Sequence, residues 1–513
     1  MDKKDAEMRQ QGERKTITFV LTQACNLRCK YCYMVHKNKD HRMSFDVAKT
    51  VVDFVLGQWG DPNFATEGVV WEFVGGEPFL EIDLIVQIIE YIKRRLYELD
   101  HPWFVNSMFS ICSNGVLYDD PRVQDLLNRY RSQIDVGITV DGTKRVQDAA
   151  RVFPDGSGSY DSVVKNIPLW LKRFPNASTK VTIARENLPF VAEAVLHIFD
   201  LGIRTVHANV VFENVWQSGD DALFEQQLDK LGDAIIERRL WKTHDCSLFS
   251  RYVGNPLPPE EDNNWCGAGR MLAVDSEGLL YPCVRFLGFS LVNKPPIVLG
   301  DVWKGLDPEK LKPFLALGRK SQSPPQCIDC EVASGCAWCQ GFNYDDAPTP
   351  TINKRAIYIC PMHKARVRAN KRFWSKIDVL EAQGEGDDMG RRCADGACLE
   401  SPDGRSRHGR LLEDNMGKEK TEEVCGKVTA EERDEIKALF LRKNALSELF
   451  LVLSRLEPKS LDPLYEKVVK DMGETAQAFH SWWDNKAAQY GWKGVEGGNW
   501  RVDFVTCEVY LVR

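Results

Sequence analysis

Three cysteines lie close together near the N-terminus, in the stretch TQACNLRCKYCYM. Three residues separate Cys25 from Cys29, and two separate Cys29 from Cys32. Three thiolates on one short loop suit three irons of a cubane [4Fe-4S] cluster, and the fourth iron then stays free to bind an outside molecule. Zinc is the alternative, because a closed zinc site needs four ligands and His36 is near enough in the sequence to be the fourth. The three cysteines alone do not decide between these two kinds of site.

The cysteine triplet follows the first of six short apolar segments that alternate with helical stretches between residue 16 and about residue 215. The segments are TITFVLTQ, GVVWEFVGG, MFSICSNG, IDVGITVDG, TKVTIA and RTVHANVVF. Amphipathic stretches between them predict helices, and Ser44 is placed to cap the first one. Repeated strand–helix units imply parallel strands joined by right-handed crossovers. The sequence therefore predicts an α/β fold, either a partial (β/α)6 barrel of the TIM type or an open doubly wound sheet.

Polar segments with glycine follow the next three predicted strands. They are Gly75-Gly76-Glu77-Pro78, Ser113-Asn114-Gly115 and Asp141-Gly142. The C-terminal ends of parallel barrel strands meet at one rim, where ligand sites are built. Glycine allows close backbone approach, and a carboxylate is a suitable acceptor for an ammonium group. We therefore expect these segments to lie beside the cysteine triplet.

Taken in this order, the motifs resemble those of the radical S-adenosylmethionine (SAM) superfamily. The resemblance implies that Cys25, Cys29 and Cys32 are the catalytic cysteines and hold a SAM-binding [4Fe-4S] cluster, whose reduction cleaves SAM to a 5′-deoxyadenosyl radical. It also implies that the backbone of the GGEP segment and its glutamate receive the SAM amine. The cofactor-binding residues expected from the resemblance are Tyr31, Gly75, Gly76, Glu77, Pro78, Ser113, Asn114 and Asp141. Asn114 as a helix cap or turn residue, and Asp141 as a turn carboxylate, are the structural alternatives.

A second set of cysteines lies in the region from about 246 to 363. Its members are Cys266, Cys283, Cys327, Cys330, Cys336, Cys339 and Cys360. Alone, the two Cys-x2-Cys pairs also fit a zinc ribbon. Together with the barrel motifs, the set resembles a SPASM domain, which carries two auxiliary [4Fe-4S] clusters. The resemblance assigns Cys327, Cys330, Cys336 and Cys360 to the second auxiliary cluster, and Cys266, Cys283 and Cys339 to the first.

The set departs from the usual SPASM pattern in two ways. Two residues, rather than three, separate Cys336 from Cys339. The nearest candidate for an additional ligand before Cys266 is Cys246, with nineteen residues between them. Either Cys246 completes the first cluster, or that cluster keeps an open iron that could bind a substrate cysteine thiolate. A plain buried thiol is the third interpretation of Cys246.

The resemblance narrows further to maturases of ribosomally made peptides. Anaerobic sulfatase-maturing enzymes carry an acidic base after a proline–cysteine pair, whereas YPCVRF has Val284 and Arg285 there. The segment GCAWCQGFNYD and the chain proportions are similar to maturases of cysteine-repeat (CXXX-type) peptides. The expected reaction is therefore a thioether crosslink in a cysteine-rich precursor peptide, with an electron donor such as flavodoxin or ferredoxin. C–C crosslinking, sulfatase-type oxidation and a non-catalytic zinc scaffold are the alternatives.

Composition excludes several other classes of function. The 513 residues include 67 Lys and Arg against 74 Asp and Glu, for a net charge of −7, so we expect no nucleic-acid partner. We expect no membrane partner either, since no apolar run is long enough to span a bilayer. The N-terminal stretch MDKKDAEMRQQGERK lacks the apolar core of a secretory signal. Sixteen cysteines without such a signal indicate a reducing cytoplasm and metal binding rather than disulfides.

These patterns predict five parts of the chain. They are an N-terminal tail (1–15), the radical SAM barrel (16–240), the SPASM domain with a terminal helix (241–382), a polar linker (383–428) and a small C-terminal α+β unit (429–513). The short tail leaves no room for a leader-binding domain, so we expect a separate leader-peptide-binding partner or a role for the C-terminal unit. Cys393 and Cys398 are expected to be exposed linker thiols.

Overall fold

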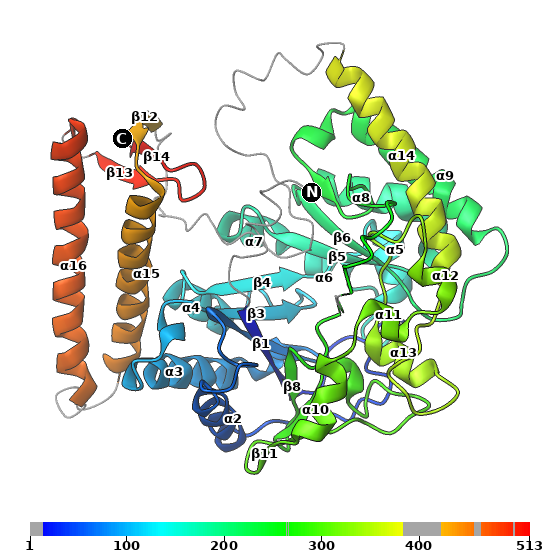
Figure 1. The fold of residues 1–513 in the computed structure, drawn as a ribbon, viewed down its shortest axis with the longest axis horizontal. Coiled ribbons are helices and arrows are strands. Elements are labelled where there is room, and N and C mark those ends of the chain that lie inside the picture. The colour runs from blue at the N-terminus through cyan, green and yellow to red at the C-terminus, as the bar shows by residue number, and fades with distance from the viewer. Residues whose placement is uncertain are drawn as a thin grey trace.

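The computed structural model describes residues 14–262, 264, 266–382, 422–455, 463–495 and 498–512 (Figure 1). Residues 1–13 of the predicted tail lie outside the described residues. So do Cys393, Cys398 and most of the predicted linker.

The strands alternate with helices through the first half of the chain, as the sequence predicts. The strands are β1 (Arg14–Thr22), β2 (Gly68–Gly75), β3 (Ser107–Ser113), β4 (Ile134–Ile138), β5 (Ser178–Ile183), β6 (Thr205–Val210), β7 (Asp245–Cys246), β8 (Leu272–Val274), β9 (Leu279–Tyr281), β10 (Gly300–Asp301), β11 (Gly305–Leu306), β12 (Glu422–Lys427), β13 (Asn499–Val502) and β14 (Glu508–Val512). The helices are α2 (Phe45–Gly57), α3 (Ile82–Glu98), α4 (Pro121–Arg129), α5 (Lys144–Ala150), α6 (Tyr160–Val164), α7 (Ile167–Arg173), α8 (Val191–Asp200), α9 (Asp220–Glu237), α10 (Pro308–Leu315), α11 (Arg319–Gln322), α12 (Pro325–Ile328), α13 (Gln340–Asp346), α14 (Cys360–Ala382), α15 (Ala430–Leu453) and α16 (Pro463–Tyr490).

All six predicted barrel segments are strands, and they pair in parallel within two sheets. The main sheet contains β1-β2-β3-β4 in this order, and β5-β6-β7 form a second sheet. Between β4 and β5 a side chain replaces the backbone ladder. The hydroxyl of Thr179 accepts a hydrogen bond from the Val140 amide (2.9 Å) and donates one to the Ile138 carbonyl (2.8 Å). The six predicted strands are therefore adjacent, but one hydrogen-bonded sheet does not run through all of them.

The main sheet is mixed, which the sequence did not predict. Beyond β1 it continues through β8, β9, β10 and β11, where β8 is parallel to β1 and the others are antiparallel. Figure 1 shows β8 beside β1 although more than 240 residues separate them in sequence. The predicted boundary at residue 240 therefore does not separate two sheets, because β8 pairs with β1 and β7 pairs with β6. β8 has only three residues, Leu-Ala-Val, and so short a segment carries no readable periodicity.

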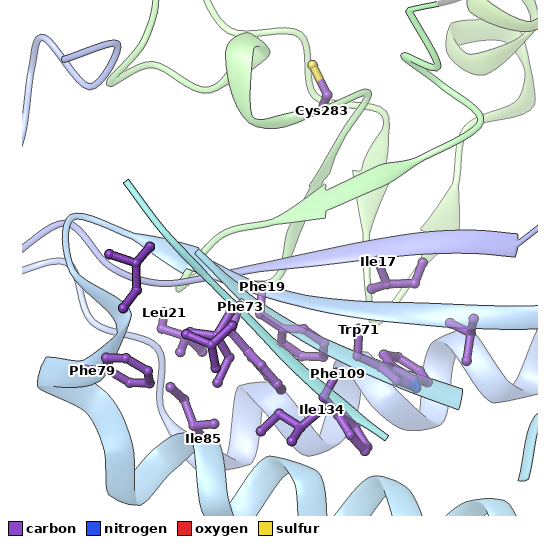
Figure 2. Close-up of a cluster of buried hydrophobic side chains, with 14 of the residues drawn as sticks. Ile17, Phe19, Leu21, Trp71, Phe73, Phe79, Ile85, Phe109, Ile134 and Cys283 are labelled. Atoms are coloured by element: carbon purple, nitrogen blue, oxygen red, sulfur yellow. The ribbon is translucent and has the colours of Figure 1, made fainter. Parts of the chain in front are cut away.

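Alternation along β1 to β3 gives the sheet an apolar and a polar face. Phe19, Phe73 and Phe109 are fully buried, and the rings of Phe19 and Phe73 lie 5.6 Å apart between centroids. Figure 2 shows these aromatic side chains gathered on one side of the sheet, with Cys283 away from them. Thr18, one residue before Phe19, faces the opposite side and donates a hydrogen bond to Glu72 (2.7 Å). The inner face of the parallel strands is thus partly polar.

Helices α9 and α14 fasten the cysteine-rich part to the barrel part. Arg368 and Arg372 of α14 form ion pairs with Glu225 of α9 (2.6 Å each), and Lys376 pairs with Asp233 (2.5 Å). Such exposed pairs contribute little individually, but this row fixes which faces of the two helices meet (Figure 1).

The C-terminal unit consists of α15, α16 and an antiparallel sheet in the order β12-β14-β13. The predicted terminal strand WRVDFVTCEVYLVR is in fact a hairpin, because Asp503 accepts hydrogen bonds from the amides of Val505 and Thr506 and turns the chain. The end of the predicted linker is also corrected, since residues 422–427 pair with β14 as β12. Within the described part of the chain, no helix is long and apolar enough to cross a bilayer.

Candidate functional site

The cysteine loop follows β1 at the C-terminal end of the parallel strands. Burial raises the pKa of the Cys25 and Cys29 thiols, and the nearby Cys32 thiol raises both further, so the three thiols are neighbours. Among the described residues, no three His, Cys, Asp or Glu side chains converge closely enough to hold a single metal ion. The side chain of His36, the alternative zinc ligand, is exposed.

The two glycines after β2 allow the chain to pass directly against the cysteine loop. The Gly76 amide donates to the Thr22 carbonyl (2.9 Å), and the Glu77 amide donates to the Ala24 carbonyl (2.9 Å). A β-carbon added at Gly76 would lie 2.1 Å from the Ala24 carbonyl oxygen, and one at Gly75 would lie 2.3 Å from that of Thr22. The glycines are therefore required by contact with the loop that carries Cys25.

We expect Gly76→Ala to displace the cysteine loop, because the obstructing atoms are backbone and cannot rotate away. Overpacking of this kind costs about 1–3 kcal/mol in the free energy of unfolding, measurable by urea titration. Iron retained after anaerobic reconstitution should fall as well. Gly60→Ala is the control, since nothing lies within 4 Å of a β-carbon added there. Equal iron content in both variants would contradict this role of Gly76.

The carboxylate of Glu77 is fully buried and joins the loops after β2 and β3. One oxygen accepts from the Phe79 amide (3.1 Å) and the Ser113 hydroxyl (2.9 Å), and the other accepts from the Asn114 amide (2.8 Å). Glu77 thus joins the two loops, and its expected contact with the SAM amine stays a prediction. Pro78 is buried at the start of the short 3-10 helix that Glu77 caps.

Asn114 fastens the loop after β3 to the cysteine loop. Its side-chain amide donates to the side-chain carbonyl of Asn26 (2.6 Å), and its own carbonyl oxygen accepts from the Val116 amide (3.0 Å). The segments predicted to lie together are thus adjacent: the cysteine loop, the GGEP turn and the Ser113-Asn114 turn.

Asp141 and Tyr31 meet at the same rim, together with a residue that the motifs did not reveal. The Tyr31 hydroxyl donates to the Asp141 carboxylate, and Arg151 donates to the Tyr31 hydroxyl (3.0 Å). Arg151 is 7% exposed, and its Nε has no hydrogen-bond partner. Burial raises the pKa of Asp141, and the charge of Arg151 lowers the pKa of both Asp141 and Cys29.

Arg151 is therefore a buried cation beside the cysteine loop, in a position to attract an anionic ligand or cluster. The backbone reinforces its position, because the Arg28 amide donates to the Val152 carbonyl (2.7 Å) and the Lys30 amide to the Ala150 carbonyl (2.9 Å). The sequence around Arg151, which directly follows α5, contains no recognisable motif. Only the folded chain shows that Arg151 belongs to the site.

The inner face of the strands below this rim carries further polar groups. Glu72 and Lys180 lie near the Cys112 thiol, since burial raises its pKa while the charge of Lys180 lowers it. The interior of a closed barrel is normally packed with branched apolar side chains. Charged groups at Glu72 and Lys180 therefore distinguish the inner face of these strands from an ordinary barrel core.

Comparison with known proteins agrees with this geometry. Residues 19–187 match the family model of the Radical SAM superfamily, a range that contains the cysteine triplet, the GGEP turn, Asn114, Asp141 and Arg151. Residues 19–187 therefore make up a radical SAM domain, as in enzymes of this superfamily.

Its relatives include proteins that modify other proteins and peptides. The cysteine-type anaerobic sulfatase-maturating enzyme of Clostridium novyi is 28% identical over 170 residues, which cover 32% of this chain and 41% of that one. The antilisterial bacteriocin subtilosin biosynthesis protein AlbA of Bacillus subtilis is 24% identical over 337 residues, 64% of this chain and 67% of AlbA. The solved structure of native anSMEcpe with bound AdoMet covers 71% of this chain and 99% of its own, with 17% identity and a TM-score of 0.52, which shows a shared fold. The radical SAM enzyme described here therefore resembles SPASM-type maturases.

In this radical SAM enzyme, the donor set formed by Cys25, Cys29 and Cys32 fits the [4Fe-4S] cluster that the family binds together with SAM. Seven of the remaining cysteines lie in two groups. In the first group, burial raises the pKa of Cys266 to about 11 and that of Cys283 well above its usual range, and the Cys339 thiol raises both further. These three thiols are therefore neighbours.

The second group contains Cys327, Cys330, Cys336 and Cys360. Burial raises the pKa of the Cys336 thiol to about 11, and the other three thiols of the group raise it further. The thiols of each group interact electrostatically with other thiols of the same group. The structure of this radical SAM enzyme therefore separates four cysteines from three.

Cys246 belongs to neither group. It is 4% exposed on β7, in the main hydrophobic core, and its charged neighbours are Asp245 and Arg366. Burial raises its pKa to about 12, as expected of an inert structural thiol. The interpretation of Cys246 as a buried thiol therefore fits the structure better than a fourth ligand for the first group.

Proposed function

We propose that this radical SAM enzyme installs a thioether crosslink in a ribosomally made, cysteine-containing precursor peptide. The observation that carries the proposal is the unequal division of the auxiliary cysteines into a group of four and a group of three. A [4Fe-4S] cluster on Cys266, Cys283 and Cys339 would have one iron without a protein ligand, and a substrate thiolate is a suitable ligand for that iron. A cluster on the group of four would have no such position.

The reaction replaces a C–H bond and an S–H bond of the peptide with a C–S bond. When bound, the cluster of the cysteine triplet and SAM supply the radical chemistry that removes the hydrogen from carbon. The chain itself bonds Asn114 to Asn26, which directly follows Cys25, and places Arg151 as a cation near Cys29. Two relatives support a peptide or protein substrate: AlbA, a protein of bacteriocin subtilosin biosynthesis, and anSMEcpe, which has been solved with AdoMet and a Cp18Cys peptide.

Anaerobic co-expression with small cysteine-rich peptides, followed by tandem mass spectrometry, tests the proposal. We expect a loss of two hydrogens per crosslink, one cysteine fewer available for alkylation, and fragments that stay joined across the linked residues. The reaction needs an electron donor, for which a flavodoxin or ferredoxin should be supplied. Loss of two hydrogens with every cysteine still free to alkylate would contradict the thioether and favour a C–C crosslink.

Sulfatase-type oxidation is the second candidate, and one contact favours it. Arg285 lies 3.6 Å from the Glu213 carboxylate, which follows β6 and is partly exposed. The sequence lacks an acid directly after Cys283, but Glu213 brings a carboxylate to the same neighbourhood. An aldehyde product would react with a hydrazine probe, whereas a thioether would not, so the same co-expression experiment separates the two reactions.

A further inference from the structure

The second group of auxiliary cysteines has a buried cation bonded to one of its sulfur atoms. The guanidinium of Arg355 donates a hydrogen bond to Cys336 Sγ (3.0 Å), and a longer one to the Cys336 carbonyl oxygen (3.5 Å). Arg355 is 8% exposed, and its guanidinium lies over the Trp338 ring at 4.3 Å from the centroid. The indole and the sulfur together fix the side chain in one place.

A second arginine approaches the same group from α14. Arg366 donates to the carbonyl oxygens of Leu248 (3.0 Å), Ser247 and Gly335 (3.2 Å), and Gly335 directly precedes Cys336. These acceptors are neutral carbonyls, so the charge of Arg366 is not cancelled by an ion pair there. Arg366 therefore adds a second positive charge near Cys336, and its three hydrogen bonds go to carbonyl oxygens rather than to the sulfur.

The cation near the group of three cysteines is itself paired with a carboxylate. The guanidinium of Arg285, two residues after Cys283, lies against the carboxylate of Glu213. Its charge is therefore partly neutralised by that carboxylate. The two groups thus differ in charge environment as well as in number of thiols.

We propose that Arg355 raises the one-electron reduction potential of an iron–sulfur cluster held by Cys327, Cys330, Cys336 and Cys360. The assignment rests on the proposed function for these four ligands. A cluster gains one negative charge on reduction, and a buried cation bonded to a ligand sulfur stabilises that reduced form. A charge-assisted hydrogen bond is about twice as strong as a neutral one, so Arg355 outweighs a backbone amide in this effect. Arg355 is a positioning and tuning residue, since it acts through Cys336.

The four-cysteine cluster would then take an electron more readily than it would without this arginine. Thioether formation from a carbon radical and a thiolate leaves one surplus electron. A cluster with four protein ligands can accept that electron, passing from the oxidised to the reduced state, and return it to the flavodoxin or ferredoxin class of partner. The position occupied by Arg355 therefore suits an electron-accepting role for this group and a substrate-binding role for the group of three.

Redox titration of the fully reconstituted protein, followed by electron paramagnetic resonance and without any peptide, tests the inference. In Arg355→Gln we expect one cluster signal to need at least tenfold stronger reducing conditions, a shift of about 59 mV to lower potential for a one-electron couple. Arg355→Lys keeps the charge and should shift less. Arg319→Gln is the matched control, because Arg319 is also buried and bonds the Glu261 and Ile328 carbonyls beside the same loop but no sulfur.

Unchanged potentials in Arg355→Gln at full iron content would overturn the inference. So would equal shifts in Arg355→Gln and Arg319→Gln, since that result would indicate a general loosening of the loop. If Arg355→Gln fails to retain iron, the test passes to Arg355→Lys. A shift of about 59 mV or more to lower potential in that variant, despite its retained charge, would also contradict the electrostatic effect. A failure of the thioether proposal leaves all these potentials as they are, because no substrate enters the measurement.

Discussion

Replacing Cys25, Cys29 and Cys32 together with alanine is expected to abolish the formation of 5′-deoxyadenosine from SAM. The structure brings these three thiols together after β1 and holds their loop through Gly76, Glu77 and Asn114. Enzymes accelerate reactions by a factor of 10⁶ or more, so the loss should be at least about a thousandfold, down to the level of a protein-free sample. Chromatographic quantification under strict exclusion of oxygen, with a chemical reductant, measures it.

The same variant separates the roles of the three groups of cysteines. The paramagnetic signal that changes on addition of SAM should disappear, while the signals of clusters on the remaining cysteines stay. Cys112→Ser is the matched control, because Cys112 lies on β3 close to the site but outside the triplet. If the triple variant still forms 5′-deoxyadenosine, the assignment of the cluster to these cysteines is wrong.

Much of this site could be predicted from the sequence because its strands and helix caps are determined by residues close together in the chain. The alternation of apolar residues in β1 to β6 and the cap at Ser44 depend on neighbouring residues, and all are confirmed. The division of seven cysteines into four and three came from a resemblance in spacing. Five of these cysteines lie in short loops, Cys327 lies in α12 and Cys360 begins α14, and the position of each follows from the neighbouring elements.

The missed features depend on contacts between distant segments. β8 joins β1 although its three residues carry no pattern, and Arg151 reaches Tyr31 across 120 positions. The burial of Glu77 likewise depends on Ser113 and Asn114, which lie more than thirty positions away and bond its carboxylate. Sequence spacing cannot show which side of a carboxylate remains open.

The C-terminal unit is less separate than its composition indicates. The lower part of α15 packs against α3 in the main hydrophobic core, through Leu446, Leu449 and Leu453 (Figure 1). A buried ion pair joins the same two helices: Lys93 donates to Glu448 (2.6 Å), and the exposed fractions of their side chains are 3% and 7%. Deletion of residues 383–513 would therefore leave Lys93 without its carboxylate and uncover apolar surface of α3. A deletion would disturb the barrel itself, so the docked unit is better tested by single substitutions.

Glu448→Ala is expected to lower the free energy of unfolding by about 3–5 kcal/mol, because it leaves the Lys93 ammonium buried without its counter-charge. Ser132 loses partners too, since its amide (2.8 Å) and hydroxyl (2.6 Å) both donate to Glu448. Urea unfolding of the full-length protein measures the effect. Lys467→Ala is the control, because the Lys467–Asp100 pair joins the same parts of the chain at the surface and should contribute only about 0–1 kcal/mol.

The double variant Lys93→Met with Glu448→Leu separates charge from packing. Replacing a buried ion pair with apolar side chains of similar volume is often neutral, or stabilising by about 1–4 kcal/mol, so the double variant should recover most of what Glu448→Ala loses. Recovery would show that the pair fixes how α15 sits on α3 more than it stabilises the contact. A double variant as unstable as Glu448→Ala would instead show that the hydrogen bonds from Ser132 to Glu448 carry the interface, because they are lost in both variants.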